Sequence, residues 1–226
     1  MATTLDREDI LDGLRALIAE LHDSHQVAGI RIVGGAALAL RYFDRGTTQD
    51  LDSLHIEPGS DAEVAAAAAK VAQSRGWDPG WLNFDVEKAD ALPTFGRRSV
   101  EWETIYDHDG IVIHVAAQEA MLAMKLRANR PGRDTNDIRQ LLRLCDVTTL
   151  NDAEEPYEDF YPGDALSDRA VNMVAAILEG GLPDEVPSPG SDSRRGHVSA
   201  EGRESFRLRG PLLVRRRVHT RRLTRS

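Results

Sequence analysis

The stretch IVGGAALALRYFDRGTTQDLDSL, residues 32–54, decides the fold. It starts at the end of a mostly apolar, β-branched run, residues 27–33, which is typical of a buried strand. Gly34-Gly35 follows, and residues 36–43 are then rich in Ala and Leu, as in a short helix. The order predicts a strand, a glycine turn and a helix in direct succession.

The next strand is predicted over residues 50–57, and it opens with Asp50-Leu51-Asp52. Residues i and i+2 of a strand point to the same face and lie about 6.5–7 Å apart along the chain. Two carboxylates placed in this way can share a divalent cation with a polyphosphate. Because any Asp-x-Asp at a strand edge can also be plain solvated surface, the motif alone does not decide the function.

Gly34-Gly35 has two readings as well. A turn without Cβ atoms lets backbone N–H groups at a helix N-terminus approach a phosphate, but an ordinary tight turn has the same sequence. The chain has neither the G-x-G-x-x-G dinucleotide fingerprint nor a Walker loop at this point. The connector to the second strand is basic and contains threonine, which favours a phosphate-holding turn beside a metal-holding carboxylate pair: Arg41, Arg45, Thr47 and Thr48.

Outside this unit, hydrophobic periodicity and capping signals predict further elements. Asp109-Gly110 is a favoured hairpin turn between two expected antiparallel strands, 100–106 and 110–116. Helices are expected over residues 5–23, 60–75, 118–129, 133–145, 149–161 and 166–179.

The fold class that follows is α+β, with a small mixed β-sheet, a helical C-terminal half and a disordered basic tail. We expect a core over residues 1–145, a helical extension packed on it over 146–180, and a linker and tail over 181–226. The composition changes from Gly180 onward to PSPGSDSRRG and similar linker sequence.

Composition restricts the class of protein. No run approaches 18 uninterrupted apolar residues, which argues against a membrane span, and the N-terminus is acidic, which argues against a secretory signal. The single cysteine, Cys145, excludes an internal disulfide framework and a multi-cysteine zinc site, and it reads as a core residue. We therefore expect a cytoplasmic protein without membrane partners.

The net charge of −9 conceals a division of charge along the chain. Residues 194–226 hold 11 of the 28 basic residues and only two acidic ones, Glu201 and Glu204, which leaves this segment at +9 and residues 1–193 at −18. A basic segment can contact nucleic acid electrostatically, although it can equally be a tail of no selected function. No Phe, Tyr or Trp follows Phe206, which weakens the case for base stacking by the end of the chain.

A second stretch, AMLAMKLRANRPGRDTNDIRQLL at residues 120–142, stands beside the first. Together, the two stretches resemble the nucleotidyltransferase superfamily, which has the polymerase-β-like fold. They look most like the small prokaryotic branch that includes the AbiEii-type and MenT-type toxins, in which a Lys on one helix precedes Arg-Asp-x-x-Asp at the start of the next. The resemblance covers about residues 25–145.

The resemblance implies transfer of a nucleoside monophosphate from a nucleoside triphosphate, with Mg²⁺ or Mn²⁺ as the cofactor. Asp50 and Asp52 match the catalytic metal carboxylates, and Lys125 matches the basic residue expected to contact phosphate. Either Asp134 or Asp137 matches the acidic residue that follows it; we assign Asp137 to the catalytic set and Asp134 to nucleotide binding. The remaining nucleotide-binding candidates are Gly34, Gly35, Arg45 and Thr48.

Simpler readings remain open for several of these residues. Lys125 can be a surface lysine whose stem packs on an apolar face, and a carboxylate in a first helical turn can simply favour the helix dipole. The spacing between the glycines and Asp50 is also longer than the superfamily usually has. A third carboxylate usually stands on a later strand, where this chain has His114, which can be an ordinary core histidine beside a two-carboxylate site.

The leading expectation is a toxin of a toxin–antitoxin system that modifies RNA, at the tRNA 3′ end, and has a cognate antitoxin protein as partner. Nucleotidyl transfer to a small molecule or a protein is the second reading. A catalytically silent binding module of the same fold is the third, and an intact Asp50, Asp52 and Lys125 argue against it.

Overall fold

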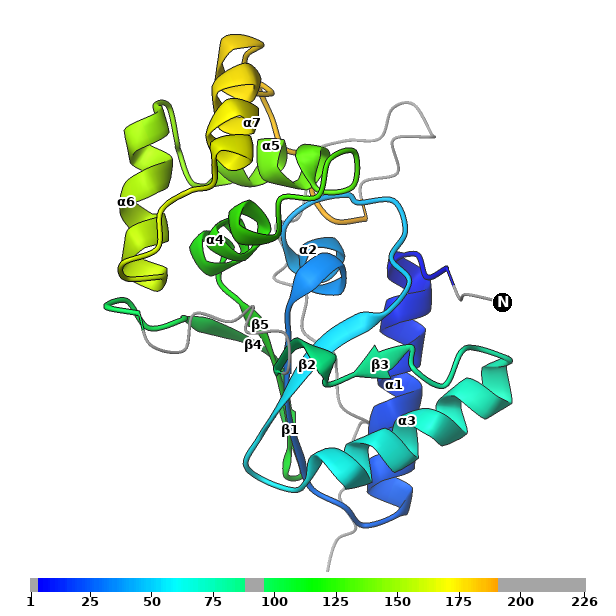
Figure 1. The fold of residues 1–226 in the computed structure, drawn as a ribbon. Helices are drawn as coiled ribbons and strands as arrows, with labels where there is room; N and C mark the ends of the chain where they lie inside the picture. The colour runs from blue at the N-terminus through cyan, green and yellow to red at the C-terminus, as the bar shows by residue number, and fades with distance from the viewer. Residues whose placement is uncertain (1–3, 88–95, 191–226) are drawn as a thin grey trace, which may run out of the picture.

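The computed structural model describes residues 4–87 and 96–190, and it has the expected α+β fold (Figure 1). Five strands form one mixed sheet in the order β3-β2-β1-β5-β4. The elements in chain order are α1 (Arg7–Asp23), β1 (Ala28–Ile32), α2 (Gly34–Arg41), β2 (Leu51–Ile56), α3 (Asp61–Arg75), β3 (Leu82–Asn83), η1 (Asp85–Glu87), β4 (Trp102–His108), β5 (Ile111–Ala116), α4 (Gln118–Ala128), α5 (Thr135–Leu144), α6 (Leu150–Phe160) and α7 (Asp168–Glu179).

The central strand, β1, pairs with β2 in the antiparallel sense and with β5 in the parallel sense. The predicted hairpin of β4 and β5 is confirmed. Its turn residues, Asp109 and Gly110, have φ of 49° and 79°. Positive φ at both central residues is what a two-residue hairpin turn needs in order to match the right-handed twist of its strands.

One face of the sheet is buried and the other is partly open. Along β1 and β5, fully buried residues such as Ile30 and Ile113 alternate with half-buried ones such as Arg31 and His114. Because successive side chains of a strand point to opposite faces, this alternation places the apolar core on one side only. Helices α1 and α3 pack against each other beside this sheet (Figure 1).

The helical C-terminal half is also confirmed. Helices α4, α5, α6 and α7 contact one another and gather at the opposite end of the sheet from α3 (Figure 1). The capping box predicted for α6 is present: the Asp152 amide donates to Thr149 Oγ1 at 3.2 Å, and the Thr149 amide donates to Asp152 Oδ2 at 2.8 Å. The helical half begins directly after β5, so it stays close to the strand that carries His114.

The structure differs from the expectations in three places. Gly34 and Gly35 are the first residues of α2 rather than a turn before it, and the short strand β3 lies in a stretch read as turns alone. Residues 181–190, predicted as the start of a linker, run back along the body: the Asp44 amide donates to the Pro187 carbonyl at 2.9 Å, and Leu182 packs against the core.

The predicted linker and disordered basic tail cover residues 181–226, of which residues 191–226 lie outside the described residues. Within the described ranges, no helix combines the length and the apolar character needed to cross a membrane.

Candidate active site

Helix α2 starts directly against the side chain of Asp52. Gly34 has φ of +68°, a conformation that favours glycine, and a Cβ at this position would lie 2.6 Å from Asp52 Oδ2. The Val33 amide donates to the Asp52 carbonyl at 3.0 Å, which fixes the two strands at this point. A glycine is therefore required here because a carboxylate occupies the space of any larger side chain.

The second glycine lies under the connector between α2 and β2. A Cβ at Gly35 would lie 2.8 Å from both Arg45 Nη1 and Thr48 Oγ1. Thr48 is fixed by a backbone pair with Leu5 and donates its hydroxyl to the Asp50 carbonyl at 3.3 Å. The structure thus brings the predicted nucleotide-binding residues Gly35, Arg45 and Thr48 together.

The two candidate metal carboxylates lie where β2 begins: Asp50 immediately precedes the strand, and Asp52 is its second residue. Burial raises the pKa of Asp52 above its ordinary value, and the negative charge of Asp50 adds to this effect. Three cations act in the opposite direction, Arg130, Lys125 and Arg133. A half-buried pair of like charges of this kind is suited to binding a cation.

Lys125 is the centre of a buried ion-pair cluster between α4 and α5. Its Nζ lies 2.8 Å from Asp134 Oδ1 and 2.9 Å from Asp137 Oδ2, and its side chain is only 6% exposed. Lys125 is therefore not the surface lysine that the sequence left open. Asp134 and Asp137, which the sequence could not separate, bind the same ammonium group.

Arginines extend this cluster in two directions. Arg45 Nε lies 2.9 Å from Asp137 Oδ1, which links the cluster to the start of α2, and Arg130 Nε lies 2.9 Å from Asp134 Oδ2. Burial alone would raise the pKa of Asp134, but hydrogen bonds from Arg130 and Lys125 outweigh it and hold that pKa below its ordinary value. The Asp134 side chain makes no capping bond to α5, so its role is in the cluster.

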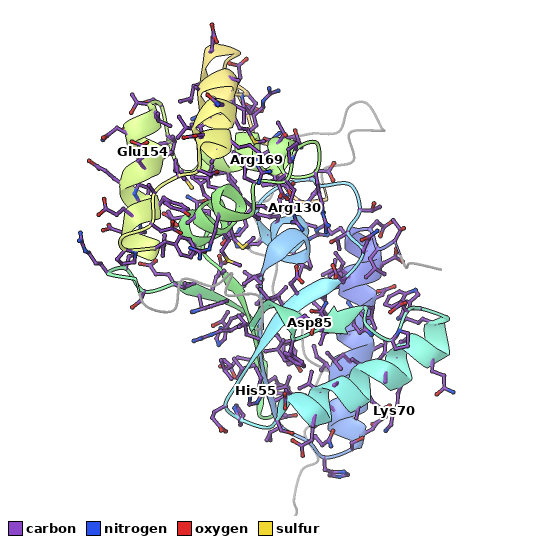
Figure 2. All side chains as sticks on the ribbon, in the orientation of Figure 1. His55, Lys70, Asp85, Arg130, Glu154 and Arg169 are labelled. Carbon is purple, nitrogen blue, oxygen red and sulfur yellow. The ribbon has the colours of Figure 1, made fainter. Side chains whose placement is uncertain are left out.

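Three residues near the site were not singled out from the sequence: Asn83, Arg130 and Arg133. Asn83 is paired in register with Asp52 on the neighbouring strand β3, and its Nδ2 donates to Asp50 Oδ2 at 3.4 Å. Figure 2 shows Arg130 at the junction of α4 and α5 above α2. Both arginines lie in the same stretch, residues 120–142, as Lys125 and the two aspartates, so their position in the sequence is a usable signal. The local sequence around Asn83, by contrast, does not indicate a strand.

His114 does not join the carboxylate pair. It is paired in register with Arg31, and its Nδ1 lies 3.0 Å from Thr104 Oγ1. Burial lowers the pKa of His114, and the charge of Arg31 lowers it further. Strand β1 lies between His114 and β2, so this histidine stands on the sheet face of Asp52 but at a distance from it.

The donor set fits a divalent cation that is held mainly by its substrate. Among the described residues, no group of three or more His, Cys, Asp or Glu side chains could hold a metal ion. Mg²⁺ commonly takes one or two carboxylates from the protein and completes its shell with phosphate oxygens and water. Asp50 and Asp52 match that pattern, since they place two carboxylates together at the start of β2.

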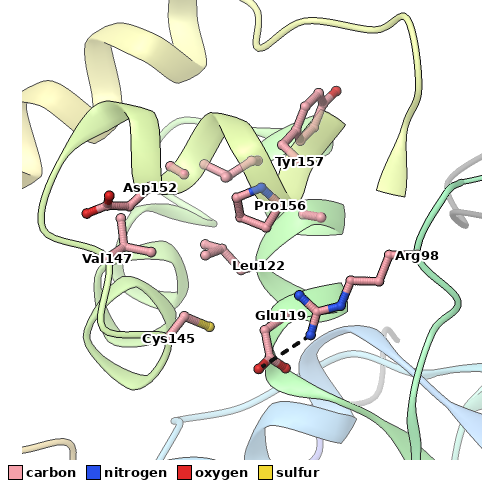
Figure 3. A pocket seen from close by; sticks show the side chains of 11 residues that line it. Arg98, Glu119, Leu122, Cys145, Val147, Asp152, Pro156 and Tyr157 are labelled. Carbon is pink, nitrogen blue, oxygen red and sulfur yellow. Dashed lines mark ion pairs between the residues drawn. The ribbon is translucent and has the colours of Figure 1, made fainter. Parts of the chain in front are cut away.

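A cavity of about 230 Å³ lies elsewhere, between α4 and α6 (Figure 3). Its walls combine apolar side chains with Asp152 and the Arg98–Glu119 ion pair, and it contains none of the predicted site residues. Burial raises the pKa of the Cys145 thiol to about 12, so the group stays protonated and is not a nucleophile at neutral pH.

A scan against protein-family models found no match to this chain. Searches of curated proteins and of solved structures likewise returned no match.

Proposed function

We propose that the protein is a metal-dependent nucleotidyltransferase, which moves a nucleoside monophosphate from a nucleoside triphosphate to an acceptor. The observation that carries the proposal is the convergence of three features from distant parts of the chain. The glycine start of α2, the carboxylate pair of β2 and the cation cluster of α4 and α5 are joined through Asp52, Arg45 and Asp137.

Each feature has a distinct part in this reaction. Asp50 and Asp52 would hold Mg²⁺ or Mn²⁺, which when bound supplies positive charge to the phosphate oxygens and the leaving group. The backbone N–H groups of Gly34 and Gly35, at the start of α2, would donate to a phosphate. The chain's own cations would provide positive potential for the triphosphate, with Lys125 acting through the carboxylates it binds, Asp134 and Asp137.

The chemical change balances without a further reactant. The acceptor oxygen forms a bond to the α-phosphorus as the bond to the α,β-bridging oxygen breaks. Pyrophosphate leaves, and the proton of the acceptor hydroxyl passes to solvent. The site residues bind and orient the triphosphate for this displacement, which is the main contribution that an enzyme makes to phosphoryl and nucleotidyl transfer.

RNA is the acceptor class that we favour, together with the toxin role and the antitoxin partner that go with the resemblance. The basic composition of residues 194–226 supports a polyanionic acceptor, because residues 1–193 alone are strongly acidic and would repel one. Protein and small-molecule acceptors become the alternative outcomes of the test.

The test uses full-length protein with Mg²⁺ and each of the four nucleoside triphosphates, labelled at either the α- or the γ-phosphate. Total tRNA, a protein extract and a protein-free extract of small molecules are offered separately as acceptors. We expect the α-label to enter tRNA and the γ-label to leave as pyrophosphate. Transfer of the γ-label would indicate a kinase instead, and α-label in protein alone would overturn the choice of RNA. No transfer of either label to any acceptor would contradict the proposal.

A further inference from the structure

The cation cluster beside the carboxylate pair has one more positive charge than it has carboxylates to balance. Its cations are Arg45, Lys125 and Arg130, and its anions are Asp134 and Asp137. Four of the five side chains are buried or nearly so, but Arg130 is 48% exposed. Within this cluster, a dissolved anion can therefore reach the unbalanced positive charge only at Arg130.

Arg130 is held in a fixed orientation rather than extended into water. Its Nε donates to Asp134 Oδ2 at 2.9 Å, its Nη2 donates to Oδ1 at 3.2 Å, and its backbone amide donates to Oδ2 at 3.0 Å. The other terminal nitrogen, Nη1, has no hydrogen-bond partner within the described part of the chain. One side of the guanidinium is thus anchored and the other is available.

Lys125, unlike Arg130, is buried and fully paired. Its ammonium contacts two carboxylates within 3 Å and has almost no access to solvent. A charge compensated in this way stabilises Asp134 but offers little to a ligand. Lys125 therefore holds the Asp134 carboxylate in place, and Asp134 in turn orients the Arg130 guanidinium.

A continuous set of side-chain contacts connects Arg130 to the candidate metal carboxylates. Asp134 joins Arg130 to Lys125, Asp137 joins Lys125 to Arg45, and Arg45 lies beside the start of α2 that faces Asp52. Among the cations that lower the pKa of Asp52, Arg130 has the largest effect. A triphosphate bound at Asp50 and Asp52 would bring its negative charge to the same place.

We infer that Arg130 is a nucleotide-binding residue that contacts the β- or γ-phosphate of the bound triphosphate, and that Asp134 and Lys125 are its positioning residues. This inference rests on the proposed function. A preoriented guanidinium is well suited to a phosphate because its planar donors match phosphate oxygens and little side-chain entropy is left to lose. Arg130 then distinguishes a nucleoside triphosphate from a monophosphate, which lacks the groups it contacts.

The experiment measures dissociation constants of full-length protein for each of the four nucleoside triphosphates with Mg²⁺ and for the matching monophosphates. The variants are Arg130→Met and Arg130→Lys, with Arg139→Met on the exposed side of α5 as the matched control. We expect Arg130→Met to weaken triphosphate binding roughly tenfold or more, as loss of a charged hydrogen bond does. Its monophosphate affinity should stay as in the wild type, Arg130→Lys should recover part of the loss, and Arg139→Met should change nothing.

Unaltered triphosphate binding by folded Arg130→Met would overturn the role of Arg130 while leaving the proposed function in place. Failure of the wild-type protein to bind any triphosphate would overturn both. If Arg130→Met does not fold, Arg130→Gln replaces it, because glutamine keeps a donor toward Asp134. Weakened triphosphate binding by this variant would support the inference, and unaltered binding would overturn it. An equal loss of triphosphate and monophosphate affinity would mean that Arg130 acts on the whole site, and it would also overturn the inference.

Discussion

The Asp52 carboxylate lies in surroundings that disfavour its charge. It is half-buried beside Asp50, and both burial and the neighbouring charge raise its pKa. We predict that Asp52→Asn lowers nucleotidyl transfer on the order of 100-fold or more, because the variant loses a metal ligand. A transfer assay checks this, with Asp107→Asn on the exposed side of β4 as a control that should keep full activity.

The same variant should raise the melting temperature at neutral pH in the absence of metal. For an acid whose pKa is raised by folding, the ionised form costs stability, and that cost is present above the folded pKa. The gap in melting temperature between variant and wild type should therefore close as the pH falls to the ordinary value of 3.8. A less stable Asp52→Asn protein at neutral pH would show that the carboxylate has a structural role instead.

Lys125 should matter for folding as well as for activity. Removing its charge leaves Asp134 and Asp137 as neighbouring buried carboxylates with one cation fewer. We predict that Lys125→Met destabilises the protein by about 3 kcal/mol, the usual cost of leaving a buried charge uncompensated. Denaturant unfolding measures this, and Lys70→Met, at a surface lysine paired with Glu20, should stay close to the wild type.

A second variant identifies the cause. In the Lys125→Met, Asp137→Asn double variant, part of the lost stability should return, because one of the two repelling carboxylates is removed. If Lys125→Met were as stable as the wild type, the cluster would contribute nothing to folding.

The residues of the candidate site were predictable from the sequence, but the contacts between their side chains were not. Asp50 and Asp52 follow from strand alternation, and Lys125 was conspicuous on an apolar helix face. Sequence spacing could not show that Lys125 contacts both Asp134 and Asp137, since that depends on how α4 and α5 pack. The same packing brings Arg45, about 90 residues away in the chain, to Asp137.

At the level of single elements, the start of α2 is a tightly constrained position. An alanine at Gly34 would require an unfavourable positive φ and would displace Asp52 Oδ2. We predict that Gly34→Ala weakens metal-dependent nucleotide binding, as measured by titration, and lowers the melting temperature. Gly46→Ala is the control, because a Cβ there would meet nothing within 4 Å. Equal behaviour of the two variants would make the α2 start an ordinary turn.

Most helices and the β4–β5 hairpin were predictable because their signals are local, namely capping residues and the Asp-Gly turn. Strand β3 was not, since two residues, Leu82 and Asn83, carry no periodicity. Its existence depends on pairing with β2, a contact across about 30 residues of chain. Asn83 was missed for the same reason, although it lies beside both candidate metal carboxylates.

At the level of the whole molecule, truncated chains test the residue at which the folded part of the protein ends. Residues 182–187 pack on the core and bond to Asp44, so a chain ending at residue 180 should melt roughly 2–8 °C lower than the full protein. A chain ending at residue 190 should keep the melting temperature and nucleotide binding, and should lose RNA association only at low salt. A large fall in melting temperature for the chain that ends at residue 190 would mean that residues 191–226 take part in the fold.

The binding of Mn²⁺ measured by electron paramagnetic resonance tests the central claim most directly, because the signal of free Mn²⁺ decreases when the ion is bound. With a nucleoside triphosphate present, full-length protein should lower the free signal beyond the effect of the nucleotide alone. Asp52→Asn should abolish this additional loss, and Asp107→Asn should retain it. No protein-dependent loss of signal with any of the four triphosphates, or the same loss with Asp52→Asn, would contradict a metal–nucleotide site at Asp50 and Asp52.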